Sequence, residues 1–484
     1  MNTEPVPHTG GLIALIPGTA GLLTVAVLGI VLLLFLIIKA RLQPFVALLA
    51  VSIAVALAAG LSVTELFGTV QRSTATSLIE TGMGGILGHV AIIIGLGTML
   101  GAILEISGGA EALAGRLLGA FGERRAPLAM GLTGLVFGIP VFFDVGIFVL
   151  APLVYAAAKR SGKSILLYCL PLLAGLSMTH AFLPPHPGPV AAAAVFQVDL
   201  GWVVLMGAVC GLPAVLAAWA FSAWIGRRIF VPVPQDMADA VEEARQAVLG
   251  DGREPAAAPR QEPVSVGIVL AIIGTPLVLI LLATFSSVTM DEGTARSLLT
   301  FFGHPFVALT LALFLAYWLL GIRRGWSRRS LEQVSTASLK PIGNILLVVG
   351  AGGVFGAVLK ASGIADALAK AFGDAGLPVI LLAWLLSVAL RVAQGSATVA
   401  IVTTAGIVQP VLASGHFSQA HLALVICAIS AGSIFASHVN DGGFWMVAKY
   451  FGISERDTLR TWTVLESVLS VAGFAVAGAV SLAV

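Results

Sequence analysis

The chain has 484 residues, of which 58% are hydrophobic and only 10% are charged, and its mean hydropathy is +1.02. Ordinary soluble domains carry about 25% charged residues, so the composition excludes a soluble protein and predicts an all-α polytopic membrane protein in a lipid bilayer. The net charge of +2 says little about partners. The three cysteines have no paired spacing, so we expect neither a disulfide nor a metal site. We also expect no cofactor and no nucleic-acid partner.

Eight apolar runs are each about long enough to cross a bilayer as a helix, which needs roughly 20 residues. No Lys or Arg precedes Lys39, so we expect the first run to remain as a membrane helix and not to be a cleavable signal. The runs lie near residues 21–38, 44–59, 85–104, 201–224, 264–288, 304–321, 341–359 and 460–484.

Basic residues indicate which loops face the cytoplasm. The clusters at 124–125 and 159–163 are both expected there, although a long apolar stretch lies between them. A single crossing cannot return the chain to the same face. A re-entrant hairpin over 126–158 can, and Gly138 and Pro140 supply the break at its tip.

A matching hairpin over 378–412, entering from the opposite face, completes the predicted topology. With both hairpins, about 21 of the 26 basic residues lie in the cytoplasm. The same count gives about ten crossings and places both termini in the periplasm.

A duplicated segment supports this architecture. Residues 97–114 and 352–369 share ten of eighteen positions at a constant offset of 255, including Gly97 and its counterpart Gly352. The predicted topology makes the two copies run in opposite directions. We therefore predict an inverted repeat with two re-entrant hairpins and two broken transmembrane helices, a design typical of secondary transporters.

The domain organisation follows from the repeat and the hairpins. We expect N-terminal helices at 1–61; a first inverted repeat at 62–230 with the hairpin 126–158 and a broken helix 164–198; a cytoplasmic linker at 231–263; connecting scaffold helices at 264–329; and a second inverted repeat at 330–484 with the hairpin 378–412 and a broken helix 420–450.

Each half also contains an apolar segment interrupted near its middle, at 179–189 and at 437–443. Unwound backbone at membrane depth is tolerated only where it is buried in protein or lines a wet cavity, so both breaks point to the substrate site. Backbone N–H groups freed after Pro187 and Asp441 are expected to attract an anion. The candidate residues at the two breaks are Thr179, His180, His186, Gly188, His438, Asn440 and Asp441.

The hairpin tips add complementary groups. Asp144 lies in apolar surroundings, where an ionised carboxylate is costly, so it suits proton coupling, or alternatively a structural hydrogen bond. Arg391 can neutralise a substrate carboxylate, or pair with Asp144 or with a loop carbonyl. Gln394, Ser396 and Thr398 follow it, although the two hydroxyls can also bond back within the helix.

The break residues have alternatives of the same kind. His180, His186 and His438 can transfer protons or bind hydroxyls, or can hold the breaks together as buried imidazoles. Asn440 and Asp441 suit the hydroxyls of a polyol, yet Asn-Asp-Gly is also ordinary turn chemistry. Glu105 and Glu466 are expected near helix ends and are left out of the site.

Five motifs lie at these tips and breaks and in the last helix. They are F-F-D-V-G (142–146), T-H-A-F-L-P-P-H-P-G-P (179–189), L-R-V-A-Q-G-S-A-T-V-A (390–400), S-H-V-N-D-G-G-F-W (437–445) and W-T-V-L-E-S (462–467). Together they resemble the gluconate permease family of proton symporters, within the ion transporter superfamily. The resemblance runs from about residue 20 to the C-terminus.

This resemblance implies proton-coupled import of gluconate or a related sugar acid across a bacterial inner membrane. It also implies a homodimer in which a mobile, elevator-like domain carries the hairpins against a static scaffold. The residues that it assigns to the substrate region are Asp144, His180, His186, Arg391, Ser396, His438, Asn440 and Asp441.

Alternative functions differ in how well they fit the sequence. Within the same class, the family resemblance leaves open a carrier for D-serine or another small hydroxy acid. A membrane-embedded hydrolase is disfavoured because neither H-E-x-x-H nor G-x-S-x-G occurs, and ATP-driven transport because no G-x-x-x-x-G-K-[ST] occurs. We therefore expect no enzyme activity. A channel fits two opposed hairpins less well than alternating access does.

Overall fold

The computed structural model describes residues 18–68, 77–234, 264–340, 342–364, 367, 378–413, 415, 417–439 and 441–484. All regular secondary structure in these residues is helical. Eight helical segments are long and apolar enough to cross a membrane, so the chain is an all-α polytopic membrane protein. The run at 44–59 is an exception to the prediction, because its helix has only 15 residues and is shorter than a simple span.

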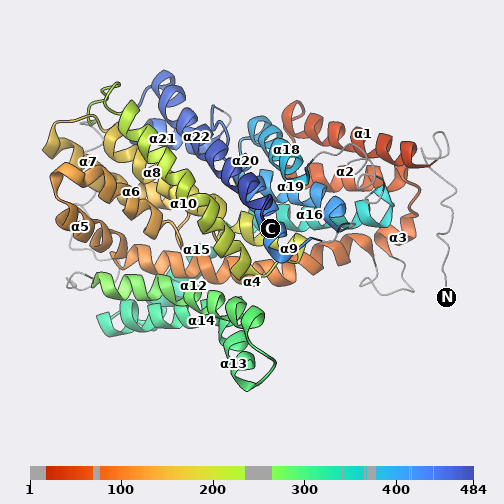
Figure 1. Cartoon of the computed structure of the whole chain (residues 1–484), viewed down its shortest axis with the longest axis horizontal. Coiled ribbons are helices and arrows are strands. Elements are labelled where there is room, and N and C mark those ends of the chain that lie inside the picture. Colours follow the sequence, from red (N-terminus) through yellow and green to blue (C-terminus); the bar gives the residue numbers. More distant parts are fainter. Residues whose placement is uncertain are drawn as a thin grey trace.

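Helix starts in the first half are often marked by a polar residue that accepts a first-turn N–H, as Ser77 and Asp199 do. The helices are α1 (Thr19–Ile38), α2 (Pro44–Ala58), α3 (Val63–Phe67), α4 (Leu78–Ile106), α5 (Gly109–Phe121), the 3-10 turn η3 (Glu123–Arg125), α6 (Ala126–Phe137), α7 (Phe143–Ser161), α8 (Leu166–Phe182), α9 (Pro187–Phe196) and α10 (Leu200–Ile225) (Figure 1).

The second half begins with three helices that lie to one side of the molecule, of which α13 protrudes furthest (Figure 1). Its elements are α12 (Val266–Thr289), α13 (Thr294–Gly303), α14 (Pro305–Ala316), the π-helical turn η4 (Tyr317–Gly321), the 3-10 turn η5 (Ile322–Arg324), α15 (Arg328–Leu339), α16 (Ile342–Ala361), α18 (Val379–Gln394), α19 (Ala397–Ala413), α20 (Gln419–Ser433), α21 (Gly442–Tyr450) and α22 (Glu455–Ser481).

The order of elements recurs between the halves. Helices α18 to α22 start about 255 positions after helices α6 to α10, each at a position that corresponds to the start of its counterpart. The packing recurs as well: α6 lies against α8 as α18 lies against α20, and α10 and α22 pack on each other.

The duplicated stretches begin in α4 and α16, which pack against each other. Gly82 of α4 lies against Val354 of α16, whereas Leu87, further along α4, lies against Gly350, earlier in α16. The two helices are therefore antiparallel.

Repeated glycines bring these two helices close to the hairpins and the first break. A Cβ on Gly101 would lie 2.2 Å from the carbonyl oxygen of Pro140 at the first hairpin tip, and a Cβ on Gly97 would lie 2.9 Å from the Cβ of Pro185. In the second copy, a Cβ on Gly352 would lie 2.8 Å from Cγ1 of Val402 in α19. Small residues are needed here because larger ones would push these elements apart.

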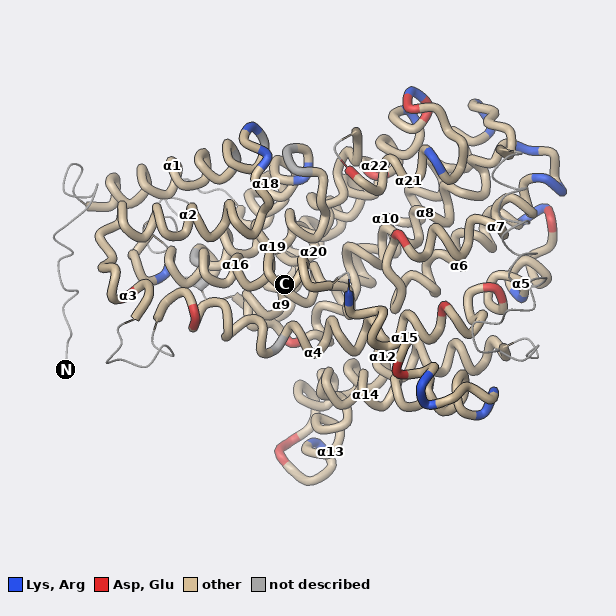
Figure 2. The backbone as a smooth tube through the Cα atoms, turned by 180° about the vertical axis from the view of Figure 1, so that it is seen from behind, with Lys and Arg blue, Asp and Glu red and all other residues tan. Residues whose placement is uncertain are grey.

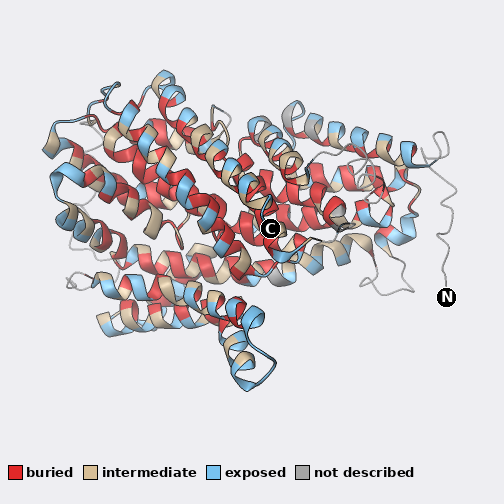
Figure 3. Cartoon of the chain, viewed as in Figure 1, coloured by how far each residue is buried: buried red, intermediate tan, exposed pale blue. Residues whose placement is uncertain are grey.

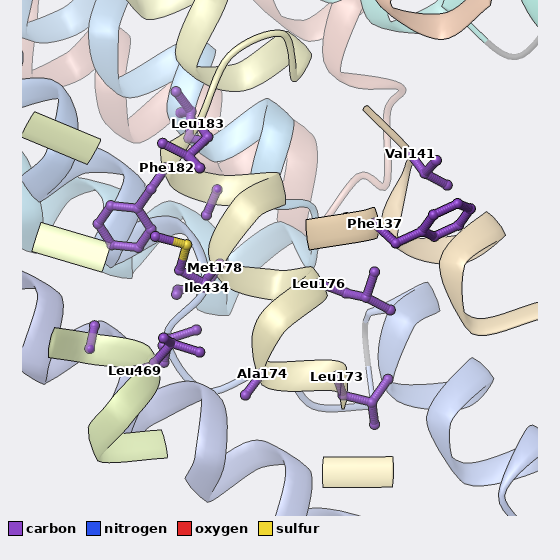
Figure 4. Packing of buried hydrophobic residues seen from close by; sticks show 14 of the residues in the cluster. Phe137, Val141, Leu173, Ala174, Leu176, Met178, Phe182, Leu183, Ile434 and Leu469 are labelled. Carbon is purple, nitrogen blue, oxygen red and sulfur yellow. The ribbon is translucent and has the colours of Figure 1, made fainter. Parts of the chain in front are cut away.

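The interior is formed by the broken helices. In Leu166–Phe196, 89% of an apolar 18-residue stretch is buried, whereas in Val266–Thr289 only 28% of such a stretch is buried, so α8 and α9 are central and α12 is peripheral (Figure 3). Residues of α8 such as Leu176 and Phe182 share one core with Ile434 and Leu469 from the second half (Figure 4). Both halves therefore enclose the region where the breaks lie.

Charged residues lie mainly in loops and at helix ends, and many Lys and Arg gather where α5, α6 and α7 meet (Figure 2). Two charged side chains differ from the others in their burial. Arg391 and Glu466 are only 4% and 2% exposed, and no other Lys, Arg, Asp or Glu among the described residues is buried to this extent.

Candidate functional site

The first break lies between α8 and α9 and is held by the first hairpin tip. Pro184 and Pro185 cannot donate to a helix ladder, and Pro187 starts the next helix at its first position. The Nε2 atom of His186 lies 2.7 Å from the carbonyl oxygen of Gly138. Because a carbonyl only accepts, this nitrogen carries the proton and joins the break to the tip.

The second break lies between α20 and α21 and centres on Asp441. Ala436 has a positive φ of 49°, which turns the chain out of α20. Asp441 then caps α21 by accepting the N–H of Gly443 at 2.9 Å. The freed N–H group expected to attract an anion is thus already occupied by a carboxylate of the chain itself.

Arg391 joins the second hairpin tip to the second break. Its guanidinium donates to the carbonyl oxygen of Gly395 and to the carboxylate of Asp441, with which it forms a largely buried ion pair. Ser437 donates to the same carboxylate, and Trp462 of α22 donates to the Ser437 hydroxyl at 2.8 Å. Of the alternatives left open by the sequence, Arg391 takes the loop carbonyl, and its carboxylate partner is Asp441 and not Asp144.

A cavity of about 330 Å³ lies between these elements, which is near the lower end of the roughly 300–1,000 Å³ range of small-molecule sites. It is lined from both hairpins, from α8, α16 and α22, and from the start of α21. Its polar lining consists of Asp144, Ser177, His180, Asn344, Arg391, Ser396, Thr398, Asp441, Trp462 and Glu466.

The predicted residues divide into three groups. Asp144, His180, Arg391, Ser396, Thr398 and Asp441 line this cavity. Thr179, His186, Gly188 and His438 are not among its lining residues and make contacts within the protein. The side chain of Gln394 and the whole of Asn440 lie outside the described residues.

Comparison with known proteins decides the family. The model of the GntP family permeases matches residues 21–483. The chain belongs to the GntP permease family. It is therefore a multi-pass membrane transporter and not an enzyme.

Relatives of this permease span nearly its whole length. It is 41% identical over 461 residues to the inner membrane permease YgbN of Escherichia coli K12, covering 94% of this chain and 97% of that protein. It is 39% identical over 456 residues to a gluconate permease of Pseudomonas aeruginosa, covering 94% and 96%. It is 35% identical over 448 residues to the Gnt-II system L-idonate transporter of E. coli, covering 92% and 95%.

Solved structures resemble the permease in fold. The YdaH transporter of Alcanivorax borkumensis matches with a TM-score of 0.60 at 14% identity, covering 91% of this chain and 98% of that one. MtrF of Neisseria gonorrhoeae matches with a TM-score of 0.57 at 17% identity, covering 94% of each. At such identities the likeness establishes the fold alone.

The two histidines of the first break lie together in the permease. The rings of His180 and His186 are 4.8 Å apart between centroids, and the Phe142 ring contacts both. His186 is fixed by Gly138, whereas Nδ1 of His180 is buried without a hydrogen-bond partner among the described residues. His180 is the one of the pair that faces the cavity.

Four polar cavity residues, Ser177, Asn344, Trp462 and Glu466, were not among the site residues predicted from the sequence. Ser177 and Glu466 are hydrogen-bonded to each other at 2.9 Å, and Asn344 accepts from Gln43 at 2.6 Å. Glu466 was expected near a helix end but lies within α22, four residues after Trp462. Glu466 could have been predicted, because an ionisable residue inside a long apolar membrane helix usually indicates a functional site.

Proposed function

We propose that this permease imports a sugar acid such as gluconate together with a proton. The observation that carries the proposal is the composition of the cavity, where one guanidinium, Arg391, stands among three carboxyl groups, Asp144, Asp441 and Glu466. The same cavity offers hydroxyl and amide groups for the hydroxyls of a polyol. Relatives named for gluconate and L-idonate favour a sugar acid over D-serine or another small hydroxy acid.

The charges of this cavity support coupling to protons. With all three carboxyl groups ionised, Arg391 would leave two negative charges uncompensated, and an entering carboxylate would add a third. Unpaired charge is costly in a site shielded from water. Binding of protons to these carboxyl groups therefore allows an anion to enter, and Asp144, His180 and His186 are the proposed proton-handling groups.

The proposed mechanism is alternating access of the elevator type. In it, the hairpins α6–α7 and α18–α19 and the broken helices move against α4 and α16, and the two halves form an inverted repeat. The antiparallel packing of α4 on α16 and the recurring order of elements support the inverted repeat. The eight candidate spans, together with α2 and the broken helix α20–α21, are compatible with ten crossings.

The setting of the protein is proposed on the same grounds. We place it in a bacterial inner membrane, because one of its relatives is named an inner membrane permease. We place both of its termini in the periplasm. The positive-inside count supports this orientation. The homodimer remains a proposal from the family resemblance.

The test is uptake of labelled gluconate by proteoliposomes under an imposed proton gradient. We expect accumulation that is abolished by a protonophore, and stronger competition by L-idonate and other sugar acids than by D-serine. Accumulation of gluconate that does not depend on the proton gradient would contradict proton symport. Stronger competition by D-serine would replace the proposed substrate.

A further inference from the structure

Helix α22 links the two breaks through one face. Trp462, Thr463 and Glu466 lie on this face because residues three and four apart are neighbours on a helix. Trp462 and Thr463 both donate to Ser437 in the second break, whereas Glu466 accepts from Ser177 of α8, which leads into the first break. The W-T-V-L-E-S motif therefore contacts both halves of the site.

Glu466 has an incomplete set of partners. Its Oε2 accepts from Ser177, but its Oε1 is buried and has no hydrogen-bond partner among the described residues. An ionised carboxylate normally accepts several hydrogen bonds, and leaving one oxygen without a donor or water is costly. The arrangement fits a neutral carboxyl group better than an ionised one.

Arg391 also lacks one hydrogen-bond partner, and what it lacks is an acceptor where Glu466 lacks a donor. Its two terminal nitrogens donate to Gly395 and Asp441, but its Nε–H is buried and has no partner in the described part of the chain. Arg391 lines the same cavity as Glu466 and acts on it electrostatically. Two residues that line one cavity thus carry a buried donor without an acceptor and a buried acid oxygen without a donor.

The other charged groups around Glu466 are accounted for. Asp441 also acts on it electrostatically, and His180 of α8 and Asp144 of α7 line the same cavity. Helix α10 has only Cys210 as a titratable residue, and it is hydrogen-bonded to Cys427 of α20. The remaining titratable residue of α20, His421, stacks on Phe417 near the start of that helix.

We propose that Glu466 is a proton-binding site of the transport cycle and that it competes with the substrate for Arg391. When Glu466 is neutral, the free Nε–H of Arg391 is available to a substrate carboxylate. When Glu466 loses its proton, it takes this donor, and the added negative charge repels the anion. This inference rests on the proposed function and assigns to Glu466 the link between proton and anion.

Two variants test the proposal in purified permease. Glu466→Gln keeps the shape but cannot lose a proton, so gluconate binding should no longer weaken as the pH rises. Its proteoliposomes should exchange gluconate but lose the accumulation of about tenfold that a gradient of one pH unit supports with one coupled proton. Ser177→Ala removes the hydroxyl that, within the described residues, donates to the carboxylate, so gluconate binding should begin to weaken at a higher pH than in the wild type.

Glu105→Gln is the matched control, since Glu105 is another acid of a long apolar helix but lines a different cavity. It should leave both the pH dependence and the accumulation unchanged. If wild-type uptake is proton-driven but neither Glu466→Gln nor Ser177→Ala changes the pH dependence of gluconate binding, the proposed role of Glu466 is wrong while the proposed function stands. Wild-type uptake that is indifferent to protons would instead reject the proposed function.

Discussion

At the scale of single residues, Arg391 is the centre of the candidate site. It is the only Lys or Arg among the described cavity residues, and it holds both the Gly395 carbonyl and Asp441. Removing it outright would leave the largely buried carboxylate of Asp441 without a compensating positive charge, which is strongly destabilising. A substitution that keeps the charge separates binding from stability.

Arg391→Lys should weaken gluconate binding with little loss of thermal stability. A lysine ammonium keeps the charge opposite Asp441, but it lacks the planar fork needed to hold a carbonyl, Asp441 and a substrate together. We expect the Kd to rise at least about tenfold, or about 1.4 kcal/mol, by isothermal titration calorimetry. Arg323→Lys, in the turn η5, is the control. An unchanged Kd in Arg391→Lys would remove Arg391 from substrate binding.

Asp144→Asn should abolish proton-driven accumulation while retaining exchange of gluconate across the membrane. The amide has nearly the same shape as the carboxyl group but cannot carry a transported proton. Uptake and counterflow in proteoliposomes measure the two activities separately. Glu123→Gln serves as the control, because Glu123 is an exposed partner of Arg160 on the surface. Normal accumulation by Asp144→Asn would exclude Asp144 from coupling.

The sequence predicted some of these residues and not their partners. Arg391, Asp441 and Asp144 were found because a charge beside a helix break in an apolar chain is informative by itself. The pairing of Arg391 with Asp441 was not among the possibilities that the sequence offered, since it joins residues from different elements through tertiary packing. Glu466 was missed because the face that α22 turns to the cavity is set by its contacts with α8, α10 and α20.

At the scale of elements, the first hairpin depends on direct backbone contact. A Cβ on Gly134 of α6 would lie 2.2 Å from the carbonyl oxygen of Leu172 in α8, and a Cβ on Gly175 of α8 would lie 2.5 Å from the nitrogen of Leu135. The two helices therefore touch through glycines on both sides, which fixes the hairpin against the broken helix.

Gly134→Ala should destabilise the protein although alanine is the better helix former. Forcing α6 away from α8 should cost about 1–3 kcal/mol, more than the roughly 1 kcal/mol gained in helix propensity. Thermal unfolding in detergent measures the difference. Gly119→Ala in α5 is the control, because a Cβ there meets nothing within 4 Å and should be neutral or stabilising. Equal stability of the two variants would contradict close packing at Gly134.

Hydropathy and helix-breaking residues predicted most elements because both signals are local. Prolines located the first break and paired glycines the second, and the apolar runs located the long helices. The sequence could not show that His186 reaches Gly138, which joins a break to a hairpin tip 48 positions earlier. Such contacts depend on how α6, α8 and α9 pack, and a single sequence does not encode that packing in a local pattern.

At the scale of the whole molecule, each half supplies a different part of one cavity. The first half contributes Asp144, Ser177 and His180, and the second contributes Arg391 and Asp441. A repeated fold with unlike chemistry in its two copies suits an asymmetric substrate with a carboxylate at one end and hydroxyls along its length. The similar elements then serve movement, and the unlike residues serve recognition.

The proposed movement can be stopped at the repeated glycines. A Cβ on Gly352 of α16 would lie 2.8 Å from Cγ1 of Val402 in α19, which is close to the separation between a Cβ and the opposite sulfur in a disulfide. The described cysteines, Cys169, Cys210 and Cys427, are all buried and free, so they should compete little with an engineered pair. A disulfide at this position would tie the second hairpin to α16.

The double variant Gly352→Cys with Val402→Cys should lose gluconate uptake on mild oxidation and regain it on reduction. If the hairpins move against α4 and α16, this bond prevents the change of access while leaving the cavity between α18, α21 and α22 intact. Gluconate binding should therefore persist in the oxidised protein, and each single cysteine variant should transport under both conditions. Full uptake by a protein whose disulfide is confirmed by mass spectrometry would mean that α16 and α19 move as one body, and the moving boundary would have to lie elsewhere.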